Sequence, residues 1–181
     1  AQLVDLMTQS QLRYQLGALP VLYALLEALQ VRQIINRHCP TRAQVDHGLV
    51  ALVLILNRLS APRPLYQIAD WLAQTVLVHQ LEVPASKFND DRLARTLAAL
   101  SEHTQAIWQD IVHRAWVQAD IDLQWLFYDL AAFVLHGEYA QSGYADFGFA
   151  HNTPMNKRKF KVGLNVSGDG YIPTAYTLWS G

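Results

Sequence analysis

The chain has 181 residues, of which 51% are hydrophobic and 16% are charged, and its formal net charge is −1. This length accommodates one good core, or one small domain with part of another, and the near-zero charge gives no global signal for a nucleic-acid or membrane partner. The single cysteine, Cys39, excludes an internal disulfide and fits a reducing compartment.

Residues 1–118 are predicted to form an all-α domain, because apolar residues recur at three- and four-residue spacing and Gly and Pro lie mainly between the runs. The clearest helix start is NDDRLAR, residues 89–95, where Asn89 or Asp90 can cap and the two acids face the positive end of the helix dipole. The expected helices span residues 20–30, 31–38, 46–59, 65–74, 89–100 and 106–118.

The periodicity changes after residue 118, and residues 119–181 are predicted to begin a β-containing domain. The run LQWLFYDLAAFVL, residues 123–135, is rich in aromatic and branched residues and has no polar helical face, which favours a buried strand. KFKVGLNV (159–166) alternates as a strand, SGDG (167–170) is typical of a turn, and YIPTAYTLW (171–179) is the returning strand. The predicted fold class is therefore α+β.

Asp129 is the one acid inside the run 123–135. An isolated ionised carboxylate in an apolar setting is costly, so this position requires an explanation. One interpretation is a structural Asp whose oxygens accept backbone N–H bonds. The other is a metal-binding carboxylate that a rigid strand holds in place, since Mg²⁺ prefers hard oxygen ligands and takes only one or two protein carboxylates.

Four basic residues follow in the stretch KRKFK: Lys157, Arg158, Lys159 and Lys161. They are interpreted either as a solvated edge strand, where lysines discourage further strand pairing, or as contacts to DNA phosphates.

Arg92 and Arg95 share one face of the helix expected at 89–100. The functional interpretation is a DNA-reading element. The plainer one is a capped helix with its own internal ion pairs, whose energies are small at a surface.

YDLAAFVLHGEY, residues 128–139, resembles the first catalytic-strand motif of bacterial insertion-sequence DDE transposases. The group is the insertion-sequence-four-like one with an N-terminal helical domain of unknown function, and its pattern is approximately Tyr/His-x-Asp-Thr-Thr-Ser-Phe, a short apolar stretch and Tyr-Gly-Glu-Tyr. Further landmarks follow in the family's order and cover nearly the whole chain: LGALP (16–20), DHGLVALVLILNRL (46–59), RPLY (63–66), NDDRLAR (89–95), GYADFGFAHN (143–152), KRKFKVGL (157–164) and DGYIPTAYTLWSG (169–181).

The resemblance implies a helical N-terminal domain, residues 1–118, for DNA binding or dimerisation, and the start of a ribonuclease-H-like α/β catalytic domain, residues 119–181. In such enzymes two Asp and one Glu hold two Mg²⁺ ions, with Mn²⁺ as a substitute, for attack on phosphodiesters. Asp129 matches the first Asp, so the resemblance makes it the catalytic and metal-binding residue. The resemblance also favours phosphate contacts by the KRKFK residues.

The implied partner is double-stranded DNA at the terminal inverted repeats of a mobile element, and a homodimer is compatible with the need to hold two DNA ends together. The longest apolar run, residues 49–56, is far shorter than the roughly 20 residues of a membrane-spanning helix, and no signal peptide is recognisable. We therefore expect a cytoplasmic, nucleoid-associated bacterial protein without a membrane partner.

The sequence also departs from the family pattern. Leu-Ala-Ala follows Asp129 where the family has Thr-Thr-Ser, so hydroxyls that could support the carboxylate are missing. The second Asp and the Glu of the pattern are expected beyond Gly181. Glu138, Asp146 and Asp169 do not stand at those positions of the pattern, and Asp169 is interpreted as a turn residue. We expect an N-terminal fragment with an incomplete metal site that is inactive alone. The alternative is a non-catalytic helical DNA-binding or protein-interaction module with a degenerate catalytic remnant.

Overall fold

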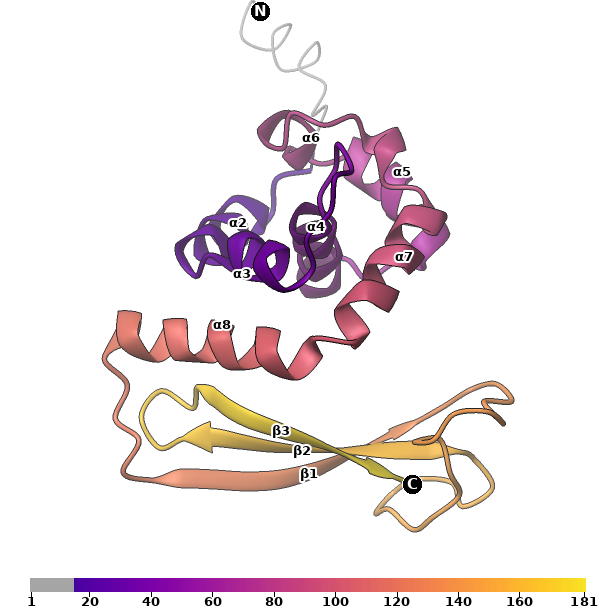
Figure 1. Ribbon diagram of the computed structural model, residues 1–181. Coiled ribbons are helices and arrows are strands. Elements are labelled where there is room, and N and C mark those ends of the chain that lie inside the picture. Colours follow the sequence, from indigo (N-terminus) through magenta and orange to yellow (C-terminus); the bar gives the residue numbers. More distant parts are fainter. Residues whose placement is uncertain (1–14) are drawn as a thin grey trace, which may run out of the picture. The chain divides into compact units, whose positions relative to one another are not determined.

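A computed structural model describes residues 15–181 (Figure 1). The chain divides into two compact units between Arg114 and Ala115. The first is helical and the second contains one three-stranded sheet, which confirms the α+β class. The elements, labelled as in Figure 1, are α2 (Leu19–Ala28), α3 (Val31–His38), α4 (His47–Ser60), the 3₁₀ turn η1 (Leu65–Gln67), α5 (Ile68–Ala73), α6 (Leu77–Gln80), η2 (Ala85–Lys87), α7 (Asp90–Ser101), α8 (Thr104–Ala119), β1 (Leu126–Val134), β2 (Lys159–Ser167) and β3 (Pro173–Ser180).

Helix α4 lies at the centre of the helical unit, in contact with α2, α3, α5 and α7 (Figure 1). Leu52, Val53 and Leu56 are completely buried, and a helix that is apolar on all sides belongs in a core. Among the described residues, no single helix has the length and apolarity to cross a membrane. Only the pair α4 and Leu65–Ala73, bent by 95°, meets those two criteria together.

The predicted helix boundaries agree with the structure where capping residues mark them. Asn89 caps α7 by accepting a hydrogen bond from the backbone N–H of Arg92 at 3.0 Å, which confirms a helix start at this motif. The helices expected at 20–30 and 31–38 are separate because Gln30 adopts a left-handed conformation, with φ of 56°. Two short elements, α6 and η2, were not predicted, because four and three residues are too few to establish a period.

The three predicted strands form an antiparallel sheet in the order β1-β2-β3. Strand β2 is therefore central, so Lys159 and Lys161 lie on an inner strand and the solvated edge-strand interpretation of these lysines is wrong. Asp129 pairs with Leu164. Its strand, β1, is at an edge of the described sheet.

The strand register divides the side chains between two faces, because directly paired residues of antiparallel strands share a face. The first, called the Asp129 face, carries Phe127, Asp129 and Phe133 of β1 with Phe160 and Leu164 of β2. The second, called the Tyr128 face, has Tyr128, Leu130 and Ala132 of β1, Lys161 and Gly163 of β2, and Thr177 and Trp179 of β3.

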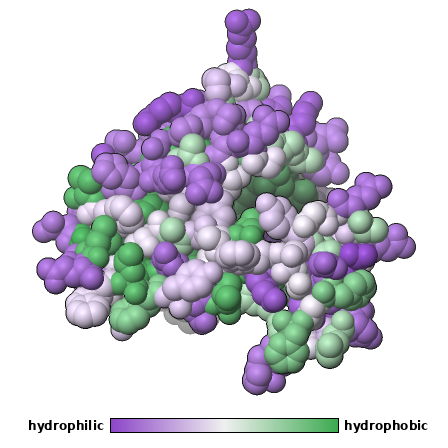
Figure 2. All heavy atoms as spheres, turned by 60° about the horizontal axis from the view of Figure 1, so that its bottom comes forward, coloured by the Kyte–Doolittle hydropathy of each residue, from purple (hydrophilic) through white to green (hydrophobic). Residues whose placement is uncertain are grey.

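Many apolar side chains of the sheet are exposed, including Phe127 (55%) and Leu130 (51%). Green hydrophobic side chains accordingly lie among polar ones on the surface of the sheet in Figure 2. The prediction of a strand at 123–135 is confirmed, but the prediction that this strand is buried is wrong. The apolar pattern predicted that other elements pack on both faces of the strand, whereas most side chains of β1 are exposed among the described residues.

Candidate functional site

Asp129 lies near the centre of β1, and its side chain is exposed. Its Oδ1 accepts a hydrogen bond from the backbone N–H of Leu130 at 2.8 Å, while Oδ2 has no hydrogen-bond partner among the described residues. The high desolvation cost expected for this carboxylate therefore does not arise. The position instead combines a fixed backbone with one oxygen available to a ligand.

The surroundings of Asp129 on its face are apolar. Leu164 stands opposite it and Tyr176 follows on β3, while Phe133 and Phe160 stack with their ring centroids 5.2 Å apart and their planes 16° from parallel. No group of three or more His, Cys, Asp or Glu side chains suited to a metal ion occurs in the described part of the chain. Asp129 thus offers a single carboxylate rather than a cluster.

Two other acids of this unit, Asp146 and Asp169, have local backbone roles. Asp146 bridges to Lys159 through two backbone hydrogen bonds of 3.1 and 2.8 Å, and its Oδ1 accepts from the N–H of Phe147 at 2.8 Å. Asp169 lies in the turn between β2 and β3, where Ser167 Oγ donates to its carbonyl at 2.5 Å. The expectation that Asp169 is a turn residue is therefore confirmed.

Two of the four predicted DNA-contacting residues are held by the protein itself. Lys159 is completely buried, and its Nζ donates to the carbonyl oxygens of Gly148 at 2.5 Å and Pro154 at 3.0 Å. Arg158 donates from Nη1 to the carbonyl of Ala145 at 2.8 Å and stacks its guanidinium 4.8 Å from the centre of the Phe147 ring. These contacts hold the segment before β2 and bury the ammonium group of Lys159, whereas Arg158 is half-buried and uses only Nη1 in its hydrogen bond.

The side chains of Lys157 and Lys161 make no hydrogen bond or ion pair with any described residue. Lys157 is exposed, and Lys161 is half-buried on the Tyr128 face. Asp129 is on the opposite face, so the structure does not bring Lys161 and Asp129 together. Of the four predicted basic residues, these two are the ones whose side chains make no polar contact with a described residue.

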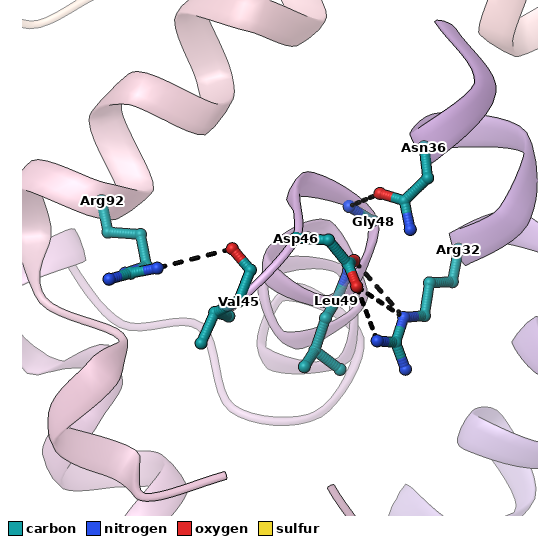
Figure 3. Close-up of polar contacts among 7 residues, drawn as sticks. All are labelled: Arg32, Asn36, Val45, Asp46, Gly48, Leu49 and Arg92. Carbon is teal, nitrogen blue, oxygen red and sulfur yellow. Dashed lines mark hydrogen bonds and ion pairs between the residues drawn. The ribbon is translucent and has the colours of Figure 1, made fainter. Parts of the chain in front are cut away.

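In the helical unit, polar contacts hold the start of α4 (Figure 3). Asp46 caps the helix by accepting from the N–H of Leu49 at 2.7 Å, and Arg32 of α3 binds the same carboxylate with a shortest contact of 2.6 Å. Burial acts to raise the pKa of Asp46, but the bonds from Arg32, Leu49 and Asn36 outweigh it, so the pKa lies below the ordinary value of 3.8.

A cavity of about 500 Å³ lies between the segment before α4 and helix α7, and its lining residues are Thr41, Ala43, Val45, His47, Arg92, Arg95 and Thr96. Nη1 of Arg92 donates to the carbonyl of Val45 at 3.4 Å. Neither arginine forms an ion pair with a described residue. The internal ion pairs expected for this capped helix are therefore missing, although the cap itself is present.

The described residues form helices followed by an antiparallel sheet, and this arrangement defines an α+β protein. Its edge strand β1 carries one exposed carboxylate, that of Asp129. More particularly, the family model described as "Domain of unknown function (DUF4277)" matches residues 12–113. This match covers more than half of the 181 residues, and the chain belongs to that family. No curated protein and no solved structure matches the chain.

Sequence reasoning missed the cavity, although Arg92 and Arg95 were candidates, because the other wall comes from residues 41–47, far away in the chain. It also missed the role of Lys159. A lysine in an alternating strand predicts a solvated charge, and only the fold of residues 148–154 places carbonyl groups around its Nζ.

Proposed function

We propose that the chain carries the helical domain and the first strands of the ribonuclease-H-like domain of a DDE transposase, an enzyme that cuts and rejoins DNA at the ends of a mobile element. The observation that carries the proposal is Asp129. It falls at the family's first catalytic Asp within an ordered set of motifs, and it stands on a regular strand with Oδ2 available. The match of residues 12–113 to a family of unknown function neither names this activity nor opposes it.

The residues present fit a divalent ion in part. Mg²⁺ and Mn²⁺ accept one or two protein carboxylates and complete their shells with water and phosphate oxygens, and Asp129 would be one such ligand. In this proposal the second Asp and the Glu come from outside this chain. When bound, two such ions supply the charge stabilisation that in-line attack on a phosphodiester requires. Asp129 would be one of the residues that hold these ions. Lys157 and Lys161 would contact the DNA backbone, Lys161 from the face of the sheet opposite to Asp129.

Paramagnetic broadening by Mn²⁺ tests the metal site in the 181-residue chain. We expect amide signals around residue 129 of β1 to broaden as Mn²⁺ is added, and Asp129→Asn to remove the effect. Asp146→Asn is the matched control, because Asp146 also accepts the N–H of the next residue at 2.8 Å. Broadening that Asp129→Asn leaves unchanged would remove Asp129 from the metal site. In the whole transposase, Asp129→Asn should abolish DNA cleavage, and unchanged cleavage would remove Asp129 from catalysis.

A second candidate is a non-catalytic helical DNA-binding or protein-interaction module. It is favoured by the three side chains that follow Asp129, which are Leu130, Ala131 and Ala132 and lack the hydroxyl groups of the family pattern. Duplex binding by a chain that shows no Mn²⁺ broadening at residue 129 would support this candidate over the enzyme.

A further inference from the structure

The cavity between residues 41–47 and α7 has a one-sided charge. Arg92, Arg95 and His47 line it, and no acidic residue does. Asp46, next to His47 in the chain, bonds to Arg32, and Figure 3 shows Arg32 and Arg92 on opposite sides of the segment that holds Asp46. Asp91, next to Arg92, is exposed and forms no ion pair with a described residue. Neither Asp46 nor Asp91 therefore pairs with the arginines of this wall.

The two guanidinium groups have no ion-pair partner among the described residues. Arg92 and Arg95 are three residues apart on α7, so they lie on one helix face, where like charges repel. The Nη1 bond from Arg92 to Val45 is long, at 3.4 Å, and Nε of Arg92 is buried without a hydrogen-bond partner. Burying an unpaired donor of a charged group costs free energy. An anion in the cavity would offset both the repulsion and the missing hydrogen bonds.

The remaining wall is polar and held in place. His47 Nδ1 lies 2.9 Å from Oγ1 of Thr96, whose side chain is buried, so the imidazole ring is fixed at the edge of the cavity. Arg95 is exposed, and it leaves the cavity accessible from solvent. A cavity of about 500 Å³ exceeds what a free phosphate ion needs and accommodates a phosphate with its flanking sugars.

We propose that this cavity, formed by His47, Arg92, Arg95 and Thr96, binds a phosphate group of a nucleic-acid backbone. The guanidinium groups donate to the phosphate oxygens, because the planar fork of arginine matches phosphate geometry. This inference rests on the proposed function, in that it assigns DNA contact to the helical unit. It does not depend on Asp129 or on metal chemistry.

Fluorescence anisotropy of a labelled duplex, titrated with the 181-residue chain at several salt concentrations, tests the inference. Arg92→Gln and Arg95→Gln should each weaken binding about tenfold and lower the slope of log K against log salt by about 1, since each removes one phosphate contact. Arg58→Gln, an exposed arginine in the last turn of α4, is the matched control and should leave the slope unchanged.

The second probe is inorganic phosphate, followed by the NMR signals of the His47 ring and of Arg92 Nε. We expect saturable shifts in the wild type that Arg95→Gln weakens. Arg95 is exposed and its side chain makes no hydrogen bond or ion pair with another described residue, so its substitution keeps the test valid even if Arg92→Gln unfolds the chain. Phosphate shifts without duplex binding would show a site for free phosphate and overturn the assignment to a nucleic acid.

The two proposals fail in different ways. If Lys157→Gln and Lys161→Gln weaken duplex binding while Arg95→Gln behaves like Arg58→Gln, the cavity is not the phosphate site, although DNA binding stands. If Arg95→Gln weakens duplex binding while Mn²⁺ has no effect at Asp129, the cavity assignment stands and the metal site fails.

Discussion

At the scale of single residues, two lysines of β2 show how one side-chain type takes two roles. Lys159 and Lys161 are two positions apart and share the Tyr128 face. The ammonium group of Lys159 is surrounded by carbonyl oxygens, whereas that of Lys161 has no hydrogen-bond partner among the described residues. Lys159 is thus a structural residue, because a buried charge must be compensated by hydrogen bonds.

Lys159→Met should destabilise the sheet by about 2 kcal/mol, because it keeps the length of the side chain but leaves the carbonyl groups of Gly148 and Pro154 without a donor. Hydrogen exchange of the β2 amides measures this loss. Lys161→Met serves as the control and should change the exchange free energy by less than about 0.5 kcal/mol. Similar exchange in the two variants would contradict a structural role for Lys159.

At the scale of elements, the start of α4 predicts a pH dependence. The pKa of Asp46 is lower in the folded protein than in the unfolded chain, because the bonds from Arg32, Leu49 and Asn36 outweigh the effect of burial. The folded state therefore binds the proton less readily. This contribution to stability is present above the unfolded pKa of about 3.9 and is lost as the pH falls through the lower, folded pKa.

The wild type should lose unfolding free energy as the pH falls through this acidic range, and Asp46→Asn should lose less. The reason is that Asn still caps a helix but carries no titrating charge. At neutral pH we expect the unfolding free energy of Asp46→Asn to be about 1 kcal/mol lower than that of the wild type, because both side chains of the Arg32–Asp46 pair are partly exposed. Urea denaturation at a series of pH values measures it. Asp91→Asn, in the first turn of α7, is the control and should keep the wild-type pH dependence. Equal pH profiles for the two variants would exclude the Asp46 contribution.

The sheet depends on a close approach at Gly163. A Cβ atom there would lie 2.1 Å from Oη of Tyr128 and 2.4 Å from Oγ1 of Thr177. These two oxygens are 3.3 Å apart, so the Tyr128 side chain of β1 crosses the central strand to reach β3. Only glycine leaves room for this contact between the outer strands.

Gly163→Ala should therefore destabilise the sheet by about 1 kcal/mol in the wild type, as it displaces Tyr128. The same substitution should cost less when Tyr128 is already Ala, because the steric conflict with its ring is then gone. A double-mutant cycle on unfolding free energies gives this coupling. A coupling of zero would mean that the Tyr128 side chain does not occupy the space beside Gly163.

At the scale of the whole molecule, the sequence predicted the elements better than it predicted their surroundings. Helix caps, turn residues and strand alternation are local signals, so the capped start of α7, the SGDG turn and the three strands agree with the structure. The exposure of Asp129, the burial of Lys159 and the cavity beside Arg92 depend on segments that meet only after folding. Apolar content in a strand indicates a preference for burial, but it does not identify what covers the strand.

The open edge of β1 predicts how the whole chain behaves in solution. The N–H of Leu135 donates to the carbonyl of Arg158, and the N–H of Gly168 donates to the carbonyl of Trp125. Because the backbone groups of a strand alternate in direction, the odd-numbered residues of β1 bond to β2. The backbone groups that point outward therefore belong to the even-numbered residues. These are Leu126, Tyr128, Leu130, Ala132 and Val134, and among their N–H groups that of Leu130 donates to Asp129 Oδ1.

This edge has no lysine, proline or bulge at its outward positions, and such edges pair with other strands. We expect the 181-residue chain to self-associate with rising concentration, and Leu130→Lys to reduce the associated fraction several-fold in sedimentation velocity. Leu97→Lys on α7 introduces the same charge at a similarly exposed leucine, 43% against 51%, away from any strand edge. Equal association of the two variants would show that contacts other than the β1 edge hold the copies together.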